Sequence, residues 1–132
     1  MIDYCQSVLE KECRQGRASL DPIESECFLL YRFVCEYENG GLSGLLYNIS
    51  PDWEYLVSLA SVLRKKDDPT LASLIEEAHA VVASGPSDYQ GTWSGWLDLA
   101  DPKKKLPKID DAISPKYSVI WRHLKGIIPK KG

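Results

Sequence analysis

The chain has 132 residues, 44% hydrophobic and 27% charged, which is typical of one soluble globular domain over residues 1–132. No apolar run approaches the roughly 20 residues of a membrane-spanning helix, and the first residues lack the basic and apolar regions of a signal peptide. We therefore expect a cytoplasmic protein that does not contact a membrane. We expect no direct binding of nucleic acid, because the net charge is −3 and nucleic acid is itself negatively charged.

The charge is unevenly distributed along the chain. Residues 1–62 carry ten acids and four bases, whereas residues 63–132 carry nine acids and twelve bases. Such an asymmetry is typical of a surface that meets a partner. It is equally consistent with two solvated faces that attract each other.

Four cysteines occur in two pairs with a spacing of eight, at positions 5, 13, 27 and 35. On a helix this spacing separates the two residues by about 12 Å, and a disulfide needs Cα atoms within about 7 Å. No Cys-x-x-Cys motif is present and neither histidine is near a pair, so a zinc site is not indicated. We predict reduced and mostly buried thiols.

Two helices are predicted in the first third of the chain. Apolar residues at helical spacing indicate one from Ile2 to about Arg14. A second helix is predicted over 22–38, because Asp21-Pro22 supplies an N-cap and Glu24 completes a capping box. It is apolar on more than one side and is therefore expected to be the most buried helix. We expect Gly40 to end it in the left-handed conformation.

The segment that follows this helix has two interpretations. It contains Asn39, Gly40, Gly41, Tyr47 and Asn48. In the favoured interpretation it is a structural joint with a fixed kink, in which the Asn48 side chain bonds backbone groups near the next helix start. In the other, Asn39, Tyr47 and Asn48 form a polar pocket for a ligand. A β-hairpin turn at Asn39-Gly40 is disfavoured by the helical spacing on both sides.

Three further helices are predicted from Ser-Pro or Asp-Pro pairs, in which an N-cap oxygen precedes a proline that needs no hydrogen bond in the first turn. These pairs, at 50–51, 68–69 and 114–115, predict helices over 51–65, 69–84 and 115–126. The short connection between the first two favours an antiparallel pair.

Residues 86–110 lack a sustained hydrophobic period and are rich in proline and glycine, which predicts an irregular loop with a short helix over 96–100. Its aromatic residues Tyr89, Trp93 and Trp96 either anchor a partner or, as we slightly favour, fold back as a lid over the core. No alternating strand pattern and no repeat occurs. The predicted fold is all-α: a single compact bundle of five to seven helices with one long irregular Trp-containing loop.

Several motifs carry a family resemblance. Gly40 and Gly41 stand in Glu-Asn-Gly-Gly, Tyr47-Asn48 follows six residues after the second glycine, and an acidic-alanine helix covers 74–78. Ile109-Asp110-Asp111 is similar to a Leu-Asp element of the same family. Over about residues 22–128 the chain resembles a bacterial family catalogued as a domain of unknown function, whose described member is a DNA-mimic protein.

The resemblance implies a helical interaction domain without catalysis. In the DNA mimic, carboxylates imitate the phosphates of duplex DNA, which carries about one charge per 1.7 Å. The ten acids of residues 1–62 make a sparser array than that. We expect a non-enzymatic domain whose acidic surface binds and blocks a partner protein, either a DNA-binding regulator or a toxin. The candidate partner surface consists of Glu24, Glu36, Glu38, Asp52, Glu54, Trp93 and Trp96.

No catalytic, cofactor-binding or metal-binding residue is predicted. His79 and His123 have no serine, cysteine or carboxylate at a recognisable triad or metal spacing. Glu36 and Glu38 are two residues apart and cannot share a helix face. The lysines at 103–105 and 108 are expected to be a solvated charge run. The alternative function is a small-ligand-binding or uncharacterised enzymatic domain centred on the Asn-Gly-Gly kink.

Overall fold

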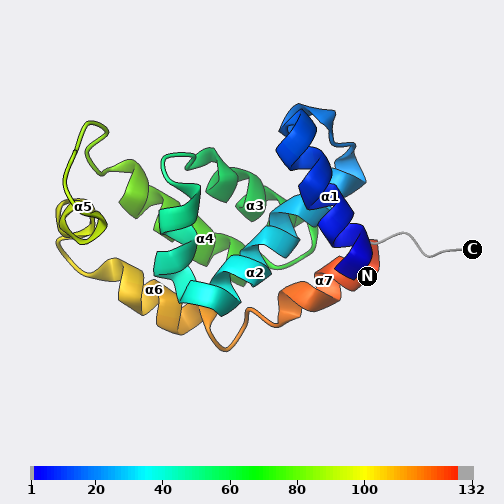
Figure 1. Ribbon diagram of the computed structural model, residues 1–132. Coiled ribbons are helices and arrows are strands. Elements are labelled where there is room, and N and C mark those ends of the chain that lie inside the picture. The colour runs from blue at the N-terminus through cyan, green and yellow to red at the C-terminus, as the bar shows by residue number, and fades with distance from the viewer. Residues whose placement is uncertain (1, 128–132) are drawn as a thin grey trace, which may run out of the picture.

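The computed structural model describes residues 2–127, in which all regular elements are helices joined by turns and short loops (Figure 1). The elements are α1 (Ile2–Gln15), the 3₁₀ helix η1 (Arg17–Ser19), α2 (Pro22–Ile49), α3 (Glu54–Lys65), α4 (Pro69–Ala83), α5 (Trp93–Ala100), α6 (Lys105–Ile113) and α7 (Val119–Ile127). The described residues thus confirm the predicted all-α bundle. Residues 1 and 128–132, which the predicted domain includes, lie outside the described part.

α2 is the central element of the bundle. It packs against α1, α3, α6 and α7, while α4 packs against α3, α5 and α6. Figure 1 shows α1 and α7 at one end of the molecule and α5 at the other. None of the helices in residues 2–127 combines the length and the apolar character that crossing a bilayer requires.

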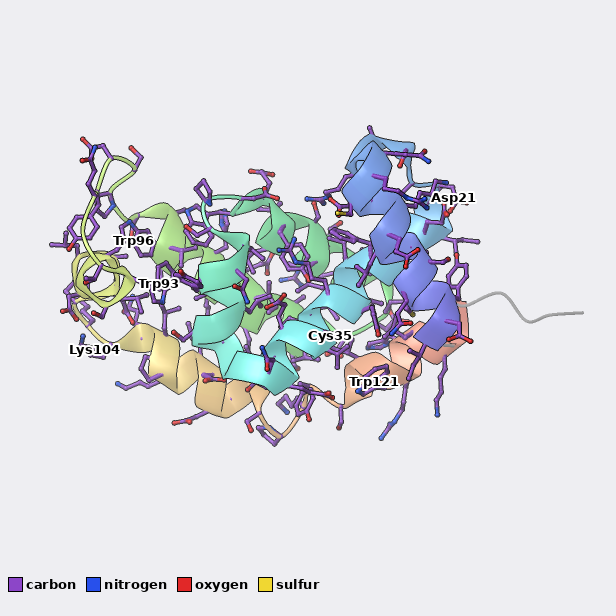
Figure 2. The ribbon with its side chains drawn as sticks, in the orientation of Figure 1. Asp21, Cys35, Trp93, Trp96, Lys104 and Trp121 are labelled. Atoms are coloured by element: carbon purple, nitrogen blue, oxygen red, sulfur yellow. The ribbon has the colours of Figure 1, made fainter. Side chains whose placement is uncertain are left out.

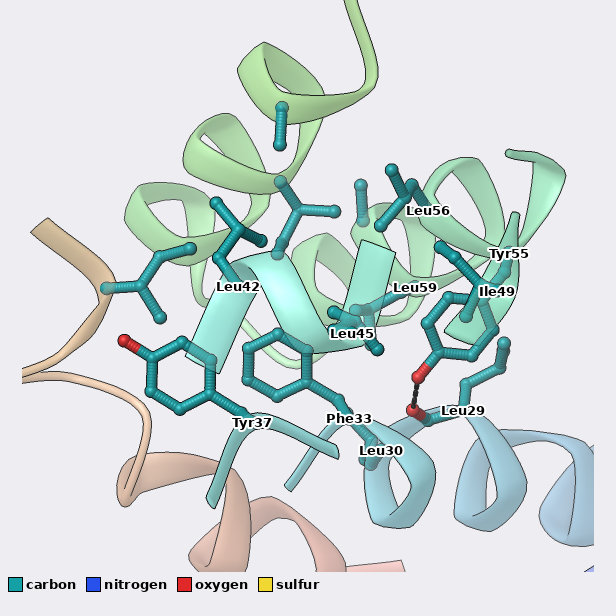
Figure 3. Close-up of a cluster of buried hydrophobic side chains, with 14 of the residues drawn as sticks. Leu29, Leu30, Phe33, Tyr37, Leu42, Leu45, Ile49, Tyr55, Leu56 and Leu59 are labelled. Carbon is teal, nitrogen blue, oxygen red and sulfur yellow. Dashed lines mark hydrogen bonds between the residues drawn. The ribbon is translucent and has the colours of Figure 1, made fainter. Parts of the chain in front are cut away.

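The hydrophobic core receives buried side chains from all seven α-helices of residues 2–127, and Figure 3 shows the part of it between α2 and α3. Phe28 and Phe33 of α2 are almost fully buried, and so is Tyr55 of α3. The Tyr55 hydroxyl donates a hydrogen bond of 2.6 Å to the Leu29 carbonyl, which satisfies the one polar atom of this ring. The prediction that the helix beginning at Pro22 is the most buried one agrees with this packing.

Two of the predicted helix starts are confirmed in detail. Asp21 and Glu24 form the expected capping box, with hydrogen bonds of 2.7 and 3.0 Å between side chain and backbone. Asp68 caps α4 by accepting from the Leu71 N–H. In both cases the N-cap residue stands outside the preceding helix, so its carboxylate is available for the new one.

Two other predicted starts are wrong. α3 begins at Glu54 and not at Pro51, and α7 begins at Val119 and not at Pro115. Ser50 and Ser114 instead end the preceding helices, since their N–H groups bond the carbonyls of residues 46 and 110. In both places the chain makes a turn before the next helix begins.

The loop expected over residues 86–110 is shorter than predicted. Both α5 and the first part of α6 fall inside it, and only short stretches such as 84–92 and 101–104 remain irregular. The Thr92 hydroxyl caps α5. The buried Asp101 carboxylate accepts from the N–H groups of Lys105 and Leu106 at 2.8 and 2.9 Å and so fixes the start of α6.

All four cysteines are free thiols, and half of them are buried. Cys5 of α1 and Cys27 of α2 are buried with their sulfur atoms 3.2 Å apart. Burial raises the pKa of both thiols. Cys13 and Cys35 are exposed, which corrects the expectation of mostly buried cysteines. They lie on outward faces of the same two helices.

We expect Asp68→Ala to lower the free energy of unfolding by about 1–3 kcal/mol. The substitution removes the cap of α4, which is typically worth about 1 kcal/mol, and the 3.1 Å contact with the His123 ring of α7. Urea denaturation measures the change. Asp88→Ala, at an exposed loop position, serves as the control and should change the value by less than about 0.5 kcal/mol. Equal effects of the two substitutions would contradict the assigned role of Asp68.

Candidate functional site: the kink of α2 and the aromatic cleft

α2 contains a sharp kink at Gly41, which has φ 64° and ψ −163° inside an otherwise helical segment. This backbone region is essentially restricted to glycine. The predicted kink is therefore present, but the residue with positive φ is Gly41 and not Gly40, which continues the first helical segment. Figure 1 shows the two segments of α2 running in different directions.

The kink is closed by a carboxylate from α6. The Tyr37 hydroxyl donates a hydrogen bond of 2.6 Å to Asp110 Oδ1. The other oxygen of Asp110 lies only 3.3 Å from the position that a Cβ atom on Gly41 would take. Burial, and then the neighbouring Asp110 carboxylate, raise the pKa of the Tyr37 phenol. The double glycine thus gives α6 a place to contact α2 closely.

A second contact joins the two segments of α2 across the kink. The Asn48 side-chain amide donates to the Glu36 carboxylate, although twelve residues of straight helix would separate them by about 18 Å. Arg32 donates to the Asn48 carbonyl at 3.3 Å. The expected bond from the Asn48 side chain to backbone near the next helix is therefore wrong, and Glu36 takes that place.

Four aromatic rings form a row, which we call the aromatic row, beside the end of α2. Tyr47 meets Trp93 edge to face at a centroid distance of 5.6 Å. Trp93 stacks on Trp96 at 5.2 Å, and Trp96 stacks on Trp53 at 5.6 Å. The row therefore joins the end of α2, the residue before α3, and α5. Figure 2 shows Trp93 and Trp96 together on α5.

The two tryptophans of α5 fold onto the molecule. Trp96 is only 9% exposed, and its indole N–H donates to the Pro86 carbonyl at 2.7 Å. Gly85 permits this approach, since a Cβ there would lie 2.5 Å from the Trp96 ring. Trp93 is half-buried and its N–H reaches the Ser43 hydroxyl at 3.5 Å. These contacts favour the interpretation of the tryptophans as a lid, and they place Trp96 inside the fold.

A cleft of about 420 Å³ opens beside the aromatic row. Five aromatic side chains line it: Tyr47, Trp53, Tyr89, Trp93 and Trp96. Tyr47 is 60% exposed and Tyr89 is 39% exposed. The Tyr89 ring folds over Gly91 and Gly95, where an added Cβ would lie 2.2 Å from its hydroxyl oxygen. Of the three residues in the expected polar pocket, only Tyr47 lines this cleft.

Two other cavities lie nearby. One of about 230 Å³ beside the kink is mainly apolar, with Leu42, Leu46 and Leu97 in its wall. The other, of about 650 Å³, lies between α4 and α6 and includes Lys103, Lys105 and Lys108 in its wall. The first N–H groups of α6 beside it already bond Asp101. Its lysines therefore do not face a free helix terminus.

The acids of the expected partner surface mostly have intramolecular partners. Glu24 completes the cap of α2 and pairs with Lys11 at 2.9 Å, and the Asp21 N–H followed by Lys11 lowers the pKa of its carboxyl. Asp52 pairs with Arg17 at 3.5 Å.

Of the three remaining acids of that surface, Glu36 accepts from Asn48 across the kink, and Glu38 and Glu54 are exposed. Glu38 accepts a hydrogen bond of 3.2 Å from the Trp121 indole, and Glu54 begins α3. The five carboxylates therefore do not form one uniform array of free charges.

The described residues contain no group of three or more side chains that could hold a metal ion. His123 contacts Asp68 at 3.1 Å, and both side chains are 16% exposed. Because the same carboxylate caps α4, this pair fixes α7 to the start of α4. His79 is half-buried on α4.

The fold and these surfaces define a small all-α domain built around one kinked helix. Comparison with protein-family models matches residues 18–122 to the DMP19-like protein family. Because this match covers most of the chain, the protein belongs to the DMP19-like family. Searches of curated proteins and of solved structures found no match. The matched region begins after α1 and includes α2 to α6 in full.

We expect Gly41→Ala to lower the free energy of unfolding by about 1–3 kcal/mol, the usual cost of a side chain held in this backbone region. Gly40→Ala is a matched control, because Gly40 is helical and a Cβ there meets nothing within 4 Å. It should leave stability unchanged or raise it by up to about 1 kcal/mol. Thermal and urea denaturation compare the two variants. A smaller loss for Gly41→Ala than for Gly40→Ala would refute this account of the kink.

The buried tyrosines predict a loss of stability at alkaline pH. Burial is the main cause of the raised pKa values of Tyr37 and Tyr55. The folded protein therefore keeps both phenolic protons at a pH where the unfolded chain, with pKa values of about 10, releases them. Their contribution is fully present below about pH 10 and is lost as pH rises further, by about 1.4 kcal/mol per pH unit for each group.

Urea denaturation between about pH 8 and pH 11 measures this dependence. Lysines and cysteines also titrate in this range, so the informative quantity is the difference between the wild type and Tyr37→Phe. The variant should show a smaller slope above pH 10. Identical slopes would mean that Tyr37 does not contribute to the alkaline loss.

Proposed function

We propose that the protein is a non-enzymatic interaction domain that binds and blocks a partner protein. The observation that carries the proposal is the partly exposed aromatic row with its cleft. Aromatic side chains are enriched where proteins bind each other, and they contribute much of the binding energy there. The Tyr47 side chain is 60% exposed, so it is available to contact a partner. Membership of the DMP19-like family supports an interaction role.

The acidic residues would contribute attraction rather than imitate DNA. Glu24, Glu36 and Asp52 hold partners within the chain, and Glu38, although exposed, accepts a hydrogen bond from the Trp121 indole. Glu54 is exposed. A phosphate mimic needs about one charge per 1.7 Å, and this surface offers far fewer free carboxylates. We therefore propose an interface with aromatic anchors and acids nearby that attract a basic partner. A DNA-binding regulator is the partner class that we favour, and a toxin domain is the second.

The rival function, binding of a small ligand at the kink, has less support. The cavity beside the kink measures about 230 Å³, below the roughly 300–1,000 Å³ of typical ligand sites. Neither Asn39 nor Asn48 lines it. Their side chains therefore do not supply the polar groups that this function would need.

The test is affinity capture with the purified protein, followed by binding measurements on the partner that is identified. Tyr47→Ala should weaken binding at least about tenfold, as expected for an interface anchor. Glu38→Gln combined with Glu54→Gln should slow association and reduce its salt dependence. Leu99→Ala is the matched control. Leu99 lies on α5 and is exposed like Tyr47, but it lines none of the three cavities.

The outcomes separate the two partner classes. Release of a captured regulator by duplex DNA supports a competitor of DNA, while neutralisation of a captured nuclease or other toxin supports an immunity-type inhibitor. Wild-type binding by both the tyrosine variant and the glutamine variant, with unchanged circular dichroism, would place the interface elsewhere and overturn the proposal.

A further inference from the structure

The cleft beside the aromatic row has a distinctive chemical character. Its thirteen lining residues include five aromatic side chains and no charged one. Its volume of about 420 Å³ falls within the roughly 300–1,000 Å³ of ligand sites. Its other side-chain groups are small, with the hydroxyls of Ser50, Ser87 and Thr92 among them. Trp96 is already stacked on Trp93 and on Trp53, so the more exposed rings of Tyr47 and Tyr89 are the π-electron faces that this wall offers, beside its hydroxyls. The wall carries no fixed positive charge.

The electrostatics of the cleft favour a cation. Aromatic rings are negative on their faces and positive at their edges. The most positive edges of Trp93 and Trp96, their indole N–H groups, are directed to the Ser43 hydroxyl and the Pro86 carbonyl. The charged residues next to the lining residues in sequence are Asp52, Glu54 and Asp88. All three are acids, although Asp52 shares its charge with Arg17.

The chain already uses the same chemistry internally. The Arg32 guanidinium lies over the Tyr55 ring at 5.4 Å, and Arg17 lies over the Phe28 ring at 5.6 Å. These distances are within the roughly 6 Å over which a cation is attracted by a ring face. Arginines of η1 and α2 thus lie over aromatic rings of α2 and α3 within the fold.

We propose that this cleft binds an arginine side chain presented by the partner protein, an inference that rests on the proposed function. A guanidinium is planar, stacks on aromatic rings and is less strongly hydrated than the ammonium of lysine. Nucleic acid is disfavoured, because bases that stack on such rings bring phosphates with them, and no lysine or arginine lines the cleft.

This assignment also accounts for the scarcity of free carboxylates. Proteins that bind DNA expose arginine for phosphate contacts. A chain that stacks those arginines on tryptophan and tyrosine can occupy such a surface without a dense array of acids. The site therefore gives the proposed function a specific recognition element.

Titration of the whole protein with short blocked peptides tests the inference. The probes are Gly-Arg-Gly, the same peptide with lysine, and the same peptide with citrulline, which keeps the shape of arginine without its charge. The readout is the set of indole N–H resonances in the NMR spectrum. Trp121 is a built-in control, because it lies on α7, contacts Glu38 and does not line the cleft.

The arginine peptide should shift the signals of Trp53, Trp93 and Trp96 in a saturable way and leave that of Trp121 in place. Citrulline should bind about tenfold more weakly, as expected for loss of a partly desolvated cation–π contact. Tyr47→Ala should weaken arginine binding by a similar factor, while Tyr47→Phe and the control Leu99→Ala should retain it.

Equal binding of the arginine and citrulline peptides would overturn the assignment. Shifts confined to Trp121, or competition by an oligothymidine, would overturn it as well. If the peptides fail to bind but a partner is captured and lost in the Glu38/Glu54 variant, the interaction function stands and the arginine cleft is wrong. If the peptide occupies the cleft and no partner is captured, the cleft assignment is supported and the proposed function fails.

Discussion

The hydrogen bond between Tyr37 and Asp110, closed over Gly41, is the constraint on which the rest of the structure depends. A straight helix of the length of α2 would extend about 42 Å and would carry Tyr47 and Ile49 away from the bundle. Instead, the backbone turns at a residue without a side chain, and the carboxylate of α6 occupies the space next to it. The second segment can then bury Leu45 and Leu46 in the core.

This joint gives a physical meaning to motifs that are far apart in the sequence. Glu36 and Asn48 join the two segments of α2, while Asp110 arrives from α6, more than sixty residues after the glycines. The same change of direction brings Tyr47 to Trp93. The double glycine therefore has a structural role. It supplies no reactive group, but the kink that it permits determines where the exposed aromatic surface forms.

Local signals in the sequence were sufficient at the two aspartate–proline pairs. Asp21 and Asp68 stand outside any preceding helix, so their pairing with proline predicted α2 and α4 correctly. Ser50 and Ser114 also precede proline, but three and four further residues form a turn before α3 and α7 begin, and the local sequence does not reveal this. The aromatic row was beyond such reasoning, because its members come from three separate segments. The intramolecular partners of the acids were equally invisible, since Asp52 and Arg17 are thirty-five residues apart.

The distribution of charge and aromatic surface decides which kind of recognition this chain can support. Its net charge is only −3, and several acids of the predicted surface are held by caps, by lysine or arginine, or by Asn48. Exposed ion pairs contribute little to affinity, typically below about 1 kcal/mol each. Aromatic contacts that become buried on binding contribute more to affinity. The edge-to-face pair of Tyr47 and Trp93 is already held in place by the kink and by α5. A rigid aromatic surface loses little conformational entropy on binding. In the proposed interaction, affinity would therefore arise from the aromatic row, while the acids would attract a basic partner.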